Sequence, residues 1–184
     1  MTDLTNRKVL MLATNGFEQS ELWAPKEALE GMGATVHLAS PAMDSIKPAH
    51  GKPREAKPDM LLGDVKEGDY DALVLPGGVS NPDTLRTKAK AVKIIKAFAG
   101  SDRPVAAICH APWLLIEAGA VKGKAVTSWP SLKTDLTNAG GKWEDSEVVT
   151  SGNIITSRKP DDIPAFNSAV ADAIAKTAKP KRAA

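Results

Sequence analysis

The sequence predicts an α/β fold, in which a largely parallel sheet is covered by helices on both faces. Short apolar runs alternate along the chain with helical patterns, which is typical of repeated βα units. Turn-forming Gly, Pro and Asn residues follow several of these runs, where strands lead into helices. With 184 residues and 42% hydrophobic content, the chain suits one domain with a sizeable core, and we expect residues 1–184 to form it.

The first third of the chain opens with a predicted βαβ unit. Its apolar runs and one amphipathic pattern closed by Gly31 predict a strand at 8–14, a helix at 21–30 and a strand at 34–39. Residues 40–69 are rich in Pro, Lys and Asp, which predicts irregular structure with a short strand or helical turn near 60–65.

The rest of the chain continues this alternation. A buried strand at 72–75 enters Pro76-Gly77-Gly78, and apolar residues spaced for one helical face predict a helix at 84–98. The later predicted elements are strands at 105–108 and 125–128, helices from 112 and over 131–139 and 163–178, and a hairpin joining 148–149 to 154–155. Residues 179–184 are predicted to be a disordered, solvated tail.

Cys109 is the only cysteine, and it stands where a strand is predicted to stop and a helix to start. Val105–Ile108 is apolar without interruption, and Pro112 is tolerated in the first turn of a helix. Ala107 and Ala111 place small residues two positions before and after the cysteine, as a nucleophile elbow requires. The sequence therefore predicts an exposed thiol, and we expect the helix N-terminus to lower the pKa of that thiol.

A lone cysteine is, by itself, more often a small buried hydrophobe than a nucleophile. The strand end, the adjacent His110 and the following proline favour the nucleophile here. His110 lies on a turn, so its side chain need not point toward the thiol, and a catalytic role for it depends on geometry.

Three turn-forming segments should meet at the carboxyl edge of the predicted sheet, where ligands bind in open α/β folds. They are residues 15–18, Pro76-Gly77-Gly78 and Cys109-His110. Gly77 and Gly78 leave their N–H groups unobstructed, and with the N–H of His110 they would form an oxyanion hole. Glu18 is either a first-turn acid that satisfies a helix N-terminus or a carboxyl partner for the thiol.

Composition argues against several other classes of protein. The net charge of +2 comes without a basic stripe interleaved with aromatic residues, so we expect no nucleic-acid partner. No apolar run approaches the ~20 residues of a membrane span, and the start of the chain lacks a secretory pattern, so we expect a cytoplasmic protein without membrane contact. His37 and His50 show no metal-ligand spacing, and we expect neither a metal nor a cofactor.

The four tryptophans are predicted to pack in the core or at an interface, because large aromatic side chains bury well. Trp113 follows the cysteine by four residues and is the one tryptophan that could also line a pocket.

Four segments together resemble the PfpI intracellular-protease family of the class I glutamine amidotransferase-like superfamily, to which the parkinsonism-associated deglycase is related. They are N-G-F-E-x-x-E-L, L-P-G-G-x-x-x-P-D-x-L-R, A-I-C-H-A-P-W-L-L and V-T-S-G-N-I-I-T-S-R. The resemblance implies a flavodoxin-like three-layer sandwich with Cys109 as the reactive cysteine and His110 as its conjugate histidine. It also implies a supporting glutamate at Glu18 beside the sulfur, and oxyanion donors at Gly78 and His110.

The resemblance further implies a homodimer or larger homo-oligomer, because an acid from the neighbouring subunit completes the site in the protease-like branch. The matching position is Asp83, which is one methylene shorter than the glutamate that the family often carries there. Lys159 likewise departs from the histidine common at its position.

The resulting expectation is a stress-related, cysteine-dependent hydrolase. The Cys109 thiolate would attack a carbonyl of a peptide, a glycation adduct or a small α-oxoaldehyde. The alternative is a non-catalytic redox sensor or stress holdase that acts through oxidation of Cys109. A third interpretation, an inert interaction subunit, predicts a thiol that reacts like free cysteine.

Overall fold

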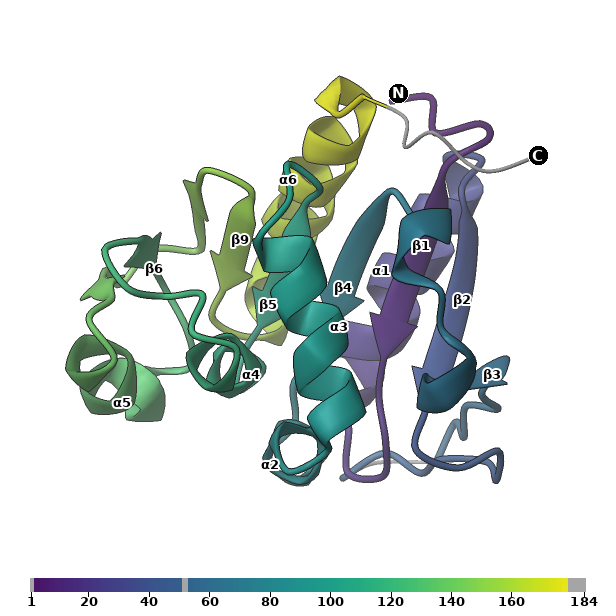
Figure 1. Cartoon of the computed structure of the whole chain (residues 1–184), viewed down its shortest axis with the longest axis horizontal. Helices are drawn as coiled ribbons and strands as arrows, with labels where there is room; N and C mark the ends of the chain where they lie inside the picture. The colour runs from purple at the N-terminus through teal and green to yellow at the C-terminus, as the bar shows by residue number, and fades with distance from the viewer. Residues whose placement is uncertain (1, 51–52, 179–184) are drawn as a thin grey trace.

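A seven-stranded sheet forms the centre of the fold, and helices cover both of its faces (Figure 1). The structure is a computed structural model that describes residues 2–50 and 53–178. The strand order is β3-β2-β1-β4-β5-β9-β8, and every adjacent pair is parallel except the antiparallel pair β8–β9. This arrangement confirms the predicted α/β class and the flavodoxin-like sandwich.

The strands of the main sheet are β1 (Lys8–Leu12), β2 (Thr35–Ser40), β3 (Met60–Leu61), β4 (Ala72–Leu75), β5 (Val105–Ile108), β8 (Val148–Ser151) and β9 (Ile154–Ser157). A separate pair consists of β6 (Ala125–Val126) and β7 (Lys142–Trp143), which are parallel. The sequence did not predict β7, because two residues are too short to show an alternating pattern.

Two hydrophobic cores lie on opposite faces of the sheet. α1 (Gln19–Gly31) and α6 (Ile163–Lys176) pack on the face that carries Val9 and Met11 of β1. The other face carries Leu10 and Leu12 and is covered by α2 (Ser80–Arg86), α3 (Ala89–Ala99), α4 (Pro112–Glu117) and α5 (Lys133–Asn138). Because helices cover both faces, the central strands are apolar on both sides, as parallel sheets require.

The single helix predicted at 84–98 is wrong, because the structure contains two helices there. Lys88 is extended and caps α3, and the Thr87 hydroxyl donates to the carbonyl oxygen of Thr84 at 2.8 Å. Leu85 is the last buried residue of α2 and Ala91 the first of α3. A spacing of six residues does not keep both side chains on one helical face, so two helices bury them separately.

The topological switch point of this fold lies at the carboxyl ends of the parallel strands. The chain leaves β1 toward α1 on one face and leaves β4 toward α2 on the other, although β1 and β4 are neighbours. Loops that diverge in this way leave a crevice at the strand ends. The turns after β1, β4 and β5 all lie at these strand ends.

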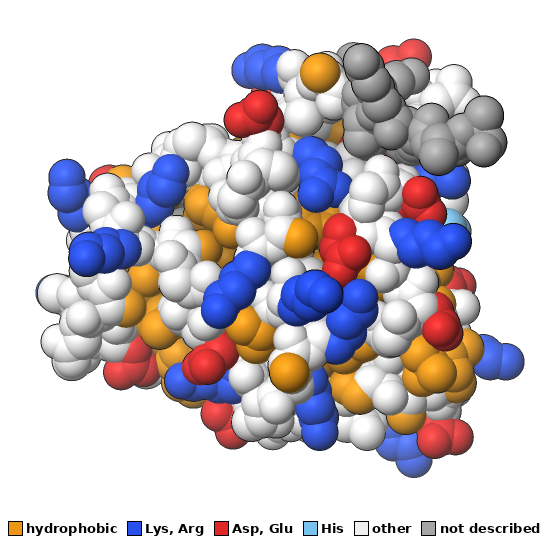
Figure 2. All heavy atoms as spheres, in the orientation of Figure 1, with side chains coloured by type: hydrophobic (Ala, Val, Ile, Leu, Met, Phe, Trp, Pro, Cys, Tyr) orange, Lys and Arg blue, Asp and Glu red, His pale blue; other side chains and the backbone are white. Residues whose placement is uncertain are grey.

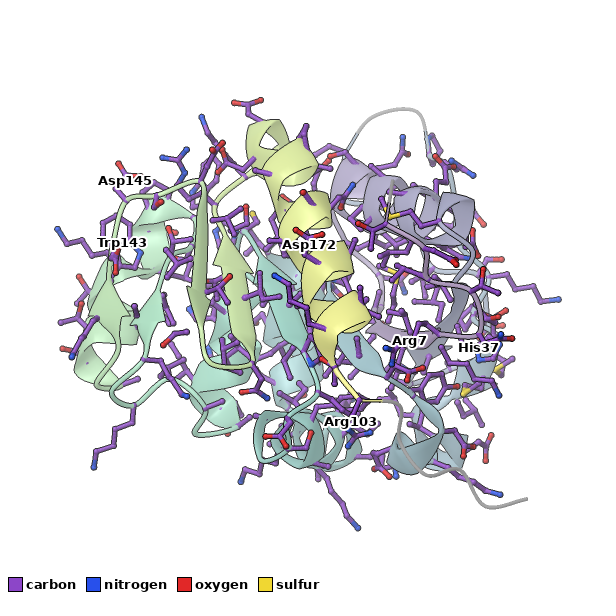
Figure 3. All side chains as sticks on the ribbon, turned by 90° about the horizontal axis from the view of Figure 1, so that it is seen from above. Arg7, His37, Arg103, Trp143, Asp145 and Asp172 are labelled. Carbon is purple, nitrogen blue, oxygen red and sulfur yellow. The ribbon has the colours of Figure 1, made fainter. Side chains whose placement is uncertain are left out.

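A buried ion pair at the amino ends of the strands links the sheet to the end of α6. Arg7 Nη1 lies 3.2 Å from Asp71 Oδ1, and Arg7 Nη2 donates to the carbonyl oxygens of Ala175 and Thr177. Figure 3 shows Arg7 between the sheet and the final turn of α6. The tail predicted at residues 179–184 lies outside the described residues. Within the described ranges, no helix is long and apolar enough to cross a membrane.

Candidate active site

Cys109 occupies a strained turn directly after β5. Its φ angle is +64°, a left-handed conformation that residues other than glycine seldom adopt. Its N–H donates to the carbonyl oxygen of Ser157 at 3.0 Å, and its carbonyl accepts from the N–H of Trp129 at 2.9 Å. These two bonds fix the backbone on both sides and hold the thiol at the predicted nucleophile elbow. The residue is only 6% exposed, so the expectation of an exposed thiol is wrong.

Gly77 and Gly78 let the loop after β4 approach this turn closely. A Cβ atom at Gly77 would lie 2.7 Å from Cys109 Cβ, and one at Gly78 would clash with the carbonyl oxygen of Gly16. Gly78 also has a φ of +77°. The backbone N–H groups of Gly78 and His110 donate toward the Cys109 sulfur. The two expected oxyanion donors therefore converge on the atom that would attack a carbonyl.

The carboxyl group beside the sulfur belongs to Glu21, which corrects the expectation for Glu18. Glu21 is fully buried, its Oε2 accepts from the N–H of Gly77 at 2.9 Å, and its carboxyl group lies close enough to the Cys109 thiol to shift the pKa of that thiol. Glu18 caps α1 instead, where it accepts from the N–H and hydroxyl of Ser20. Position 21 enters the site because it lies inside α1, on the side that faces the sheet.

Burial changes the protonation of both groups. It raises the pKa of the Glu21 carboxyl to about 8, so this group holds a proton at neutral pH. Burial and the negative charge that Glu21 would carry raise the pKa of the Cys109 thiol, against the lowering effect of the Gly78 and His110 N–H groups. The expectation of a pKa lowered by a helix N-terminus is thus wrong, since α4 is short and burial dominates.

The side chain of His110 turns toward the thiol. Its Nδ1 lies 3.1 Å from Cys109 Sγ, and its Nε2 lies 3.4 Å from the Ser131 hydroxyl. The ring lies against Trp113 and is stacked with Trp129, with centroids 5.4 and 5.8 Å away. Burial lowers the pKa of His110, which favours a neutral imidazole that can accept a proton.

A cavity of about 600 Å³ opens above the thiol, within the size range of small-molecule sites. Trp129 lines it and is 39% exposed, whereas Trp113 donates its indole N–H to Asp135 away from the cavity. Trp113 therefore lies outside the cavity lining, and the packing predicted for Trp129 is the expectation that is wrong. Trp129 enters the site because its backbone N–H bonds the carbonyl of Cys109. The lining residues are Gly16, Glu18, Glu21, Ala49, His50, Gly78, Val79, Ser80, Cys109, His110, Trp129 and Pro160.

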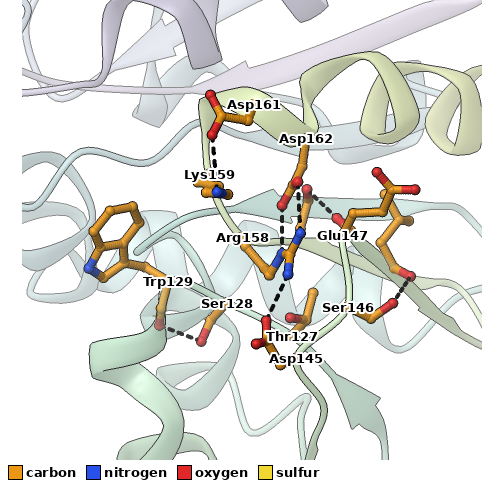
Figure 4. A network of polar contacts seen from close by, with 12 residues as sticks. Thr127, Ser128, Trp129, Asp145, Ser146, Glu147, Arg158, Lys159, Asp161 and Asp162 are labelled. Atoms are coloured by element: carbon orange, nitrogen blue, oxygen red, sulfur yellow. Dashed lines mark hydrogen bonds and ion pairs between the residues drawn. The ribbon is translucent and has the colours of Figure 1, made fainter.

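Asp83 and Lys159 do not line this cavity. Asp83 is exposed on α2, one turn after the cavity residue Val79. The Lys159 ammonium lies 3.0 Å from the Asp161 carboxylate, beside the lining residue Pro160 (Figure 4). Among the described residues, no group of three or more His, Cys, Asp or Glu is placed to hold a metal ion.

A thiol at the elbow of a parallel sheet, with a histidine and a buried glutamate beside it, defines a class of α/β proteins with a cysteine site. Residues 7–173 match the model of the DJ-1/PfpI family, and the chain belongs to this family. The resemblance seen in the sequence motifs is confirmed.

Three relatives illustrate the range of the family. YraA of Bacillus subtilis strain 168, named as a candidate cysteine protease, is 42% identical over 163 residues, which are 88% of this chain and 95% of YraA. Deglycase PH1704 of Pyrococcus horikoshii is 42% identical over 159 residues, 86% of this chain and 94% of that protein. Both names describe enzymes, in agreement with the expectation from the sequence. The crystal structure of Drosophila melanogaster DJ-1beta has a TM-score of 0.85 at 28% identity, with 93% of this chain and 91% of that chain covered.

Proposed function

We propose that this protein is a cysteine-dependent deglycase of the PfpI type, which acts on adducts of α-oxoaldehydes and on methylglyoxal itself. The observation that carries this proposal is the placement of the Cys109 sulfur between a protonated Glu21 and two backbone N–H donors, at the floor of a cavity. Such a site offers a nucleophile, an acid and an oxyanion hole within one small volume. The name of the relative PH1704 supports the same class of reaction.

The first step is attack of the sulfur on the aldehyde carbon. His110 Nδ1, 3.1 Å from the sulfur, accepts the thiol proton as the C–S bond forms. The electron pair of the C=O bond moves to oxygen, where the N–H groups of Gly78 and His110 stabilise the negative charge. With an amine-borne adduct, the C–N bond breaks in this step instead, and the departing amine takes the proton.

The second step moves hydrogen within the bound product. Glu21 gives its proton to the oxyanion and, now a carboxylate, takes the proton from the attacked carbon and returns it to the neighbouring carbonyl carbon, while the hydroxyl proton moves to the second oxygen. The product is a lactoyl thioester of Cys109, which water hydrolyses to lactate and free thiol. The sum is methylglyoxal plus water giving lactate, so no external oxidant or reductant is required.

Peptide hydrolysis is a second candidate, favoured by the neutral His110 at hydrogen-bond distance from the thiol and by the name of YraA. Both reactions use the same nucleophile, so substrate assays separate them.

A second copy of the chain is proposed to add Asp83 to this site. Asp83 is exposed beside Val79, which is itself 52% exposed at the cavity, so a neighbouring subunit could reach both. Light scattering would give the oligomeric state. If the proposal holds, Asp83→Asn lowers turnover without changing that state; a fully active Asp83→Asn protein would contradict it.

The first test is lactate formation from methylglyoxal by the wild type and by Cys109→Ala, each shown to be folded by circular dichroism. The wild type should form lactate and Cys109→Ala should not. Full activity of Cys109→Ala would overturn the proposal. If neither protein forms lactate, a peptide library and a peroxide titration followed by intact mass would test the peptidase, and the redox sensor or holdase, in turn.

A further inference from the structure

We infer that Ser131 is a positioning residue of this site, whose hydroxyl group holds the His110 imidazole so that Nδ1 faces the Cys109 sulfur. This role rests on the proposed function, in which His110 accepts the thiol proton. Ser131 lies 21 residues after His110 in the sequence, in a different segment of the chain. It is not among the residues that line the cavity, so it would act through His110 and not by contact with a substrate.

The ring of His110 has one orientation that satisfies both of its nitrogen atoms. Nδ1 lies 3.1 Å from Cys109 Sγ, and Nε2 lies 3.4 Å from the Ser131 hydroxyl oxygen. Rotating the ring by half a turn about its Cβ–Cγ bond would put a carbon atom at each of these two places. The contact with Ser131 therefore favours the orientation that offers a nitrogen to the thiol.

The same contact determines where the neutral imidazole carries its hydrogen. Nδ1 can accept the thiol proton only if it is unprotonated, so the hydrogen of the neutral ring must lie on Nε2. The Ser131 oxygen can accept a hydrogen bond from this N–H. Once Nδ1 has taken the thiol proton, the ring is positively charged and the bond to Ser131 becomes stronger. Ser131 therefore favours both the tautomer that starts the reaction and the imidazolium that the first step forms.

The segment that carries Ser131 is anchored to the turn of the nucleophile. The Trp129 N–H donates to the Cys109 carbonyl at 2.9 Å. A single turn of 3-10 helix, Pro130–Leu132, follows, and the side chain of Leu132 is fully buried. Ser131 is thus held between two fixed neighbours, although it lies at the surface itself.

Two tryptophans confine the faces of the His110 ring without choosing its orientation. Trp129 is stacked with the ring at an interplanar angle of 23°, and Trp113 is tilted against it by 59°. Such ring contacts limit the tilt of an imidazole, but they do not tell its nitrogen atoms from its carbon atoms. Within the part of the chain that the structure describes, Ser131 is the one side chain at hydrogen-bond distance from Nε2. The choice of orientation therefore depends on this hydroxyl.

The contact lies within one chain. A third group that orients the base is a general feature of activated nucleophiles, and the motif resemblance implies that an acid from a neighbouring subunit fills this role. Ser131 reaches His110 without a second copy of the chain. The role of Ser131 is therefore independent of the one proposed for Asp83.

The sole cysteine allows a test that does not require turnover. Cys109 is alkylated with iodoacetamide, and intact mass gives the rate for the wild type, Ser131→Ala and Ser131→Thr. The reagent is uncharged, because Lys and Arg side chains are spread over the face that carries α3 and would concentrate an anionic reagent (Figure 2).

We expect Ser131→Ala to react about fivefold more slowly than the wild type, as the loss of one hydrogen bond would produce. Ser131→Thr keeps the hydroxyl group and should react at the wild-type rate. Equal rates for Ser131→Ala and the wild type would overturn the inference, and so would a Ser131→Thr protein as slow as Ser131→Ala.

The tautomer of His110 gives a signature that a purely structural role would not change. In protein labelled with ¹⁵N-histidine, long-range ¹H–¹⁵N correlation spectra distinguish the two neutral tautomers. The chain has three histidines, and the signal missing from His110→Gln identifies the one of interest. We expect the hydrogen on Nε2 in the wild type and a larger Nδ1–H fraction in Ser131→Ala. Hydrogen on Nδ1 in the wild type, or equal fractions in the two proteins, would overturn the inference.

Ser168→Ala is a matched control for the loss of a hydroxyl group. Ser168 is exposed on α6 and is not among the residues that line the cavity. Its replacement should leave both the alkylation rate and the His110 tautomer unchanged. A rate as low as that of Ser131→Ala would show that the effect is not specific to Ser131 and would overturn the inference.

Lactate formation from methylglyoxal, measured in parallel, separates this role from the proposed function. Slower alkylation of Ser131→Ala, in a protein whose wild type forms no lactate, would overturn only the deglycase proposal. Lactate formation by the wild type, with unchanged alkylation and unchanged turnover in Ser131→Ala, would overturn only the role of Ser131.

Discussion

The Glu21 carboxyl group accepts a hydrogen bond from the N–H of Gly77 at 2.9 Å, across 56 residues of sequence. This bond joins the first turn of α1 to the loop after β4. The next residue of that loop, Gly78, directs its own N–H toward the Cys109 sulfur. One buried side chain therefore contacts the thiol and also positions a donor that faces it.

Replacing Glu21 by Gln should remove a pH dependence of stability. The pKa of this carboxyl rises from 4.5 to about 8 on folding, so the native state binds one more proton than the unfolded state between these values. The wild type should consequently lose stability as pH rises through this window, by on the order of 1 kcal/mol per pH unit relative to Glu21→Gln. Urea unfolding of both proteins at several pH values measures this difference, and parallel curves would contradict it.

The strained turn predicts an unusual order of stability for two inactive variants. Cys109→Gly and Cys109→Ala both remove the thiol, but only glycine adopts a φ of +64° without strain. We expect Cys109→Gly to be the more stable by about 1 kcal/mol. Denaturant midpoints of the two proteins give the answer; a more stable alanine variant would show that the turn relaxes.

Gly78→Ala should disrupt the site through a clash of backbone atoms. Gly119 is a matched control, because its φ is +70° but a Cβ there meets nothing within 4 Å. Gly119→Ala should therefore cost about 1–2 kcal/mol from backbone strain alone. Gly78→Ala should cost roughly 3 kcal/mol or more and abolish turnover. Similar losses in the two variants, measured by thermal unfolding, would argue against the close packing of the loop.

Arg7→Met should destabilise the fold far more than Lys26→Met. Arg7 is paired with a fully buried Asp71, whereas Lys26 pairs with Glu30 one turn along the surface of α1. Breaking a buried pair costs about 3–5 kcal/mol, and an exposed pair contributes less than about 1 kcal/mol. Equal unfolding free energies for the two variants would show that the Arg7 contacts add little.

The strands around the thiol could be predicted because the sequence patterns that mark them are local. β4 and β5 have the predicted bounds, since each is an uninterrupted apolar run that ends at a turn signal. The break between α2 and α3 was not predictable in this way. Neither Gly nor Pro marks it, and only the packing of Leu85 and Ala91 on the sheet requires two helices.

The choice between Glu18 and Glu21 depends on tertiary structure. Both lie in the same motif, and the angle at which α1 enters decides which one reaches the sulfur. One signal was present: Glu21 lies four residues before Pro25 and eight before Leu29, on the buried side of the helix. A carboxyl group on an apolar stripe requires a polar neighbour, and here the N–H of Gly77 and the thiol lie beside it.

The hydrogen bond from the Cys109 N–H to the Ser157 carbonyl also determines when the site can form during synthesis of the chain. β9 is the last strand to leave the ribosome, yet it lies directly beside β5. A nascent chain that ends before the β8–β9 hairpin lacks the neighbour that holds the cysteine turn in its left-handed conformation. The reactive thiol is therefore assembled only when translation of the domain is nearly complete, and shortened translation products should lack the ordered site.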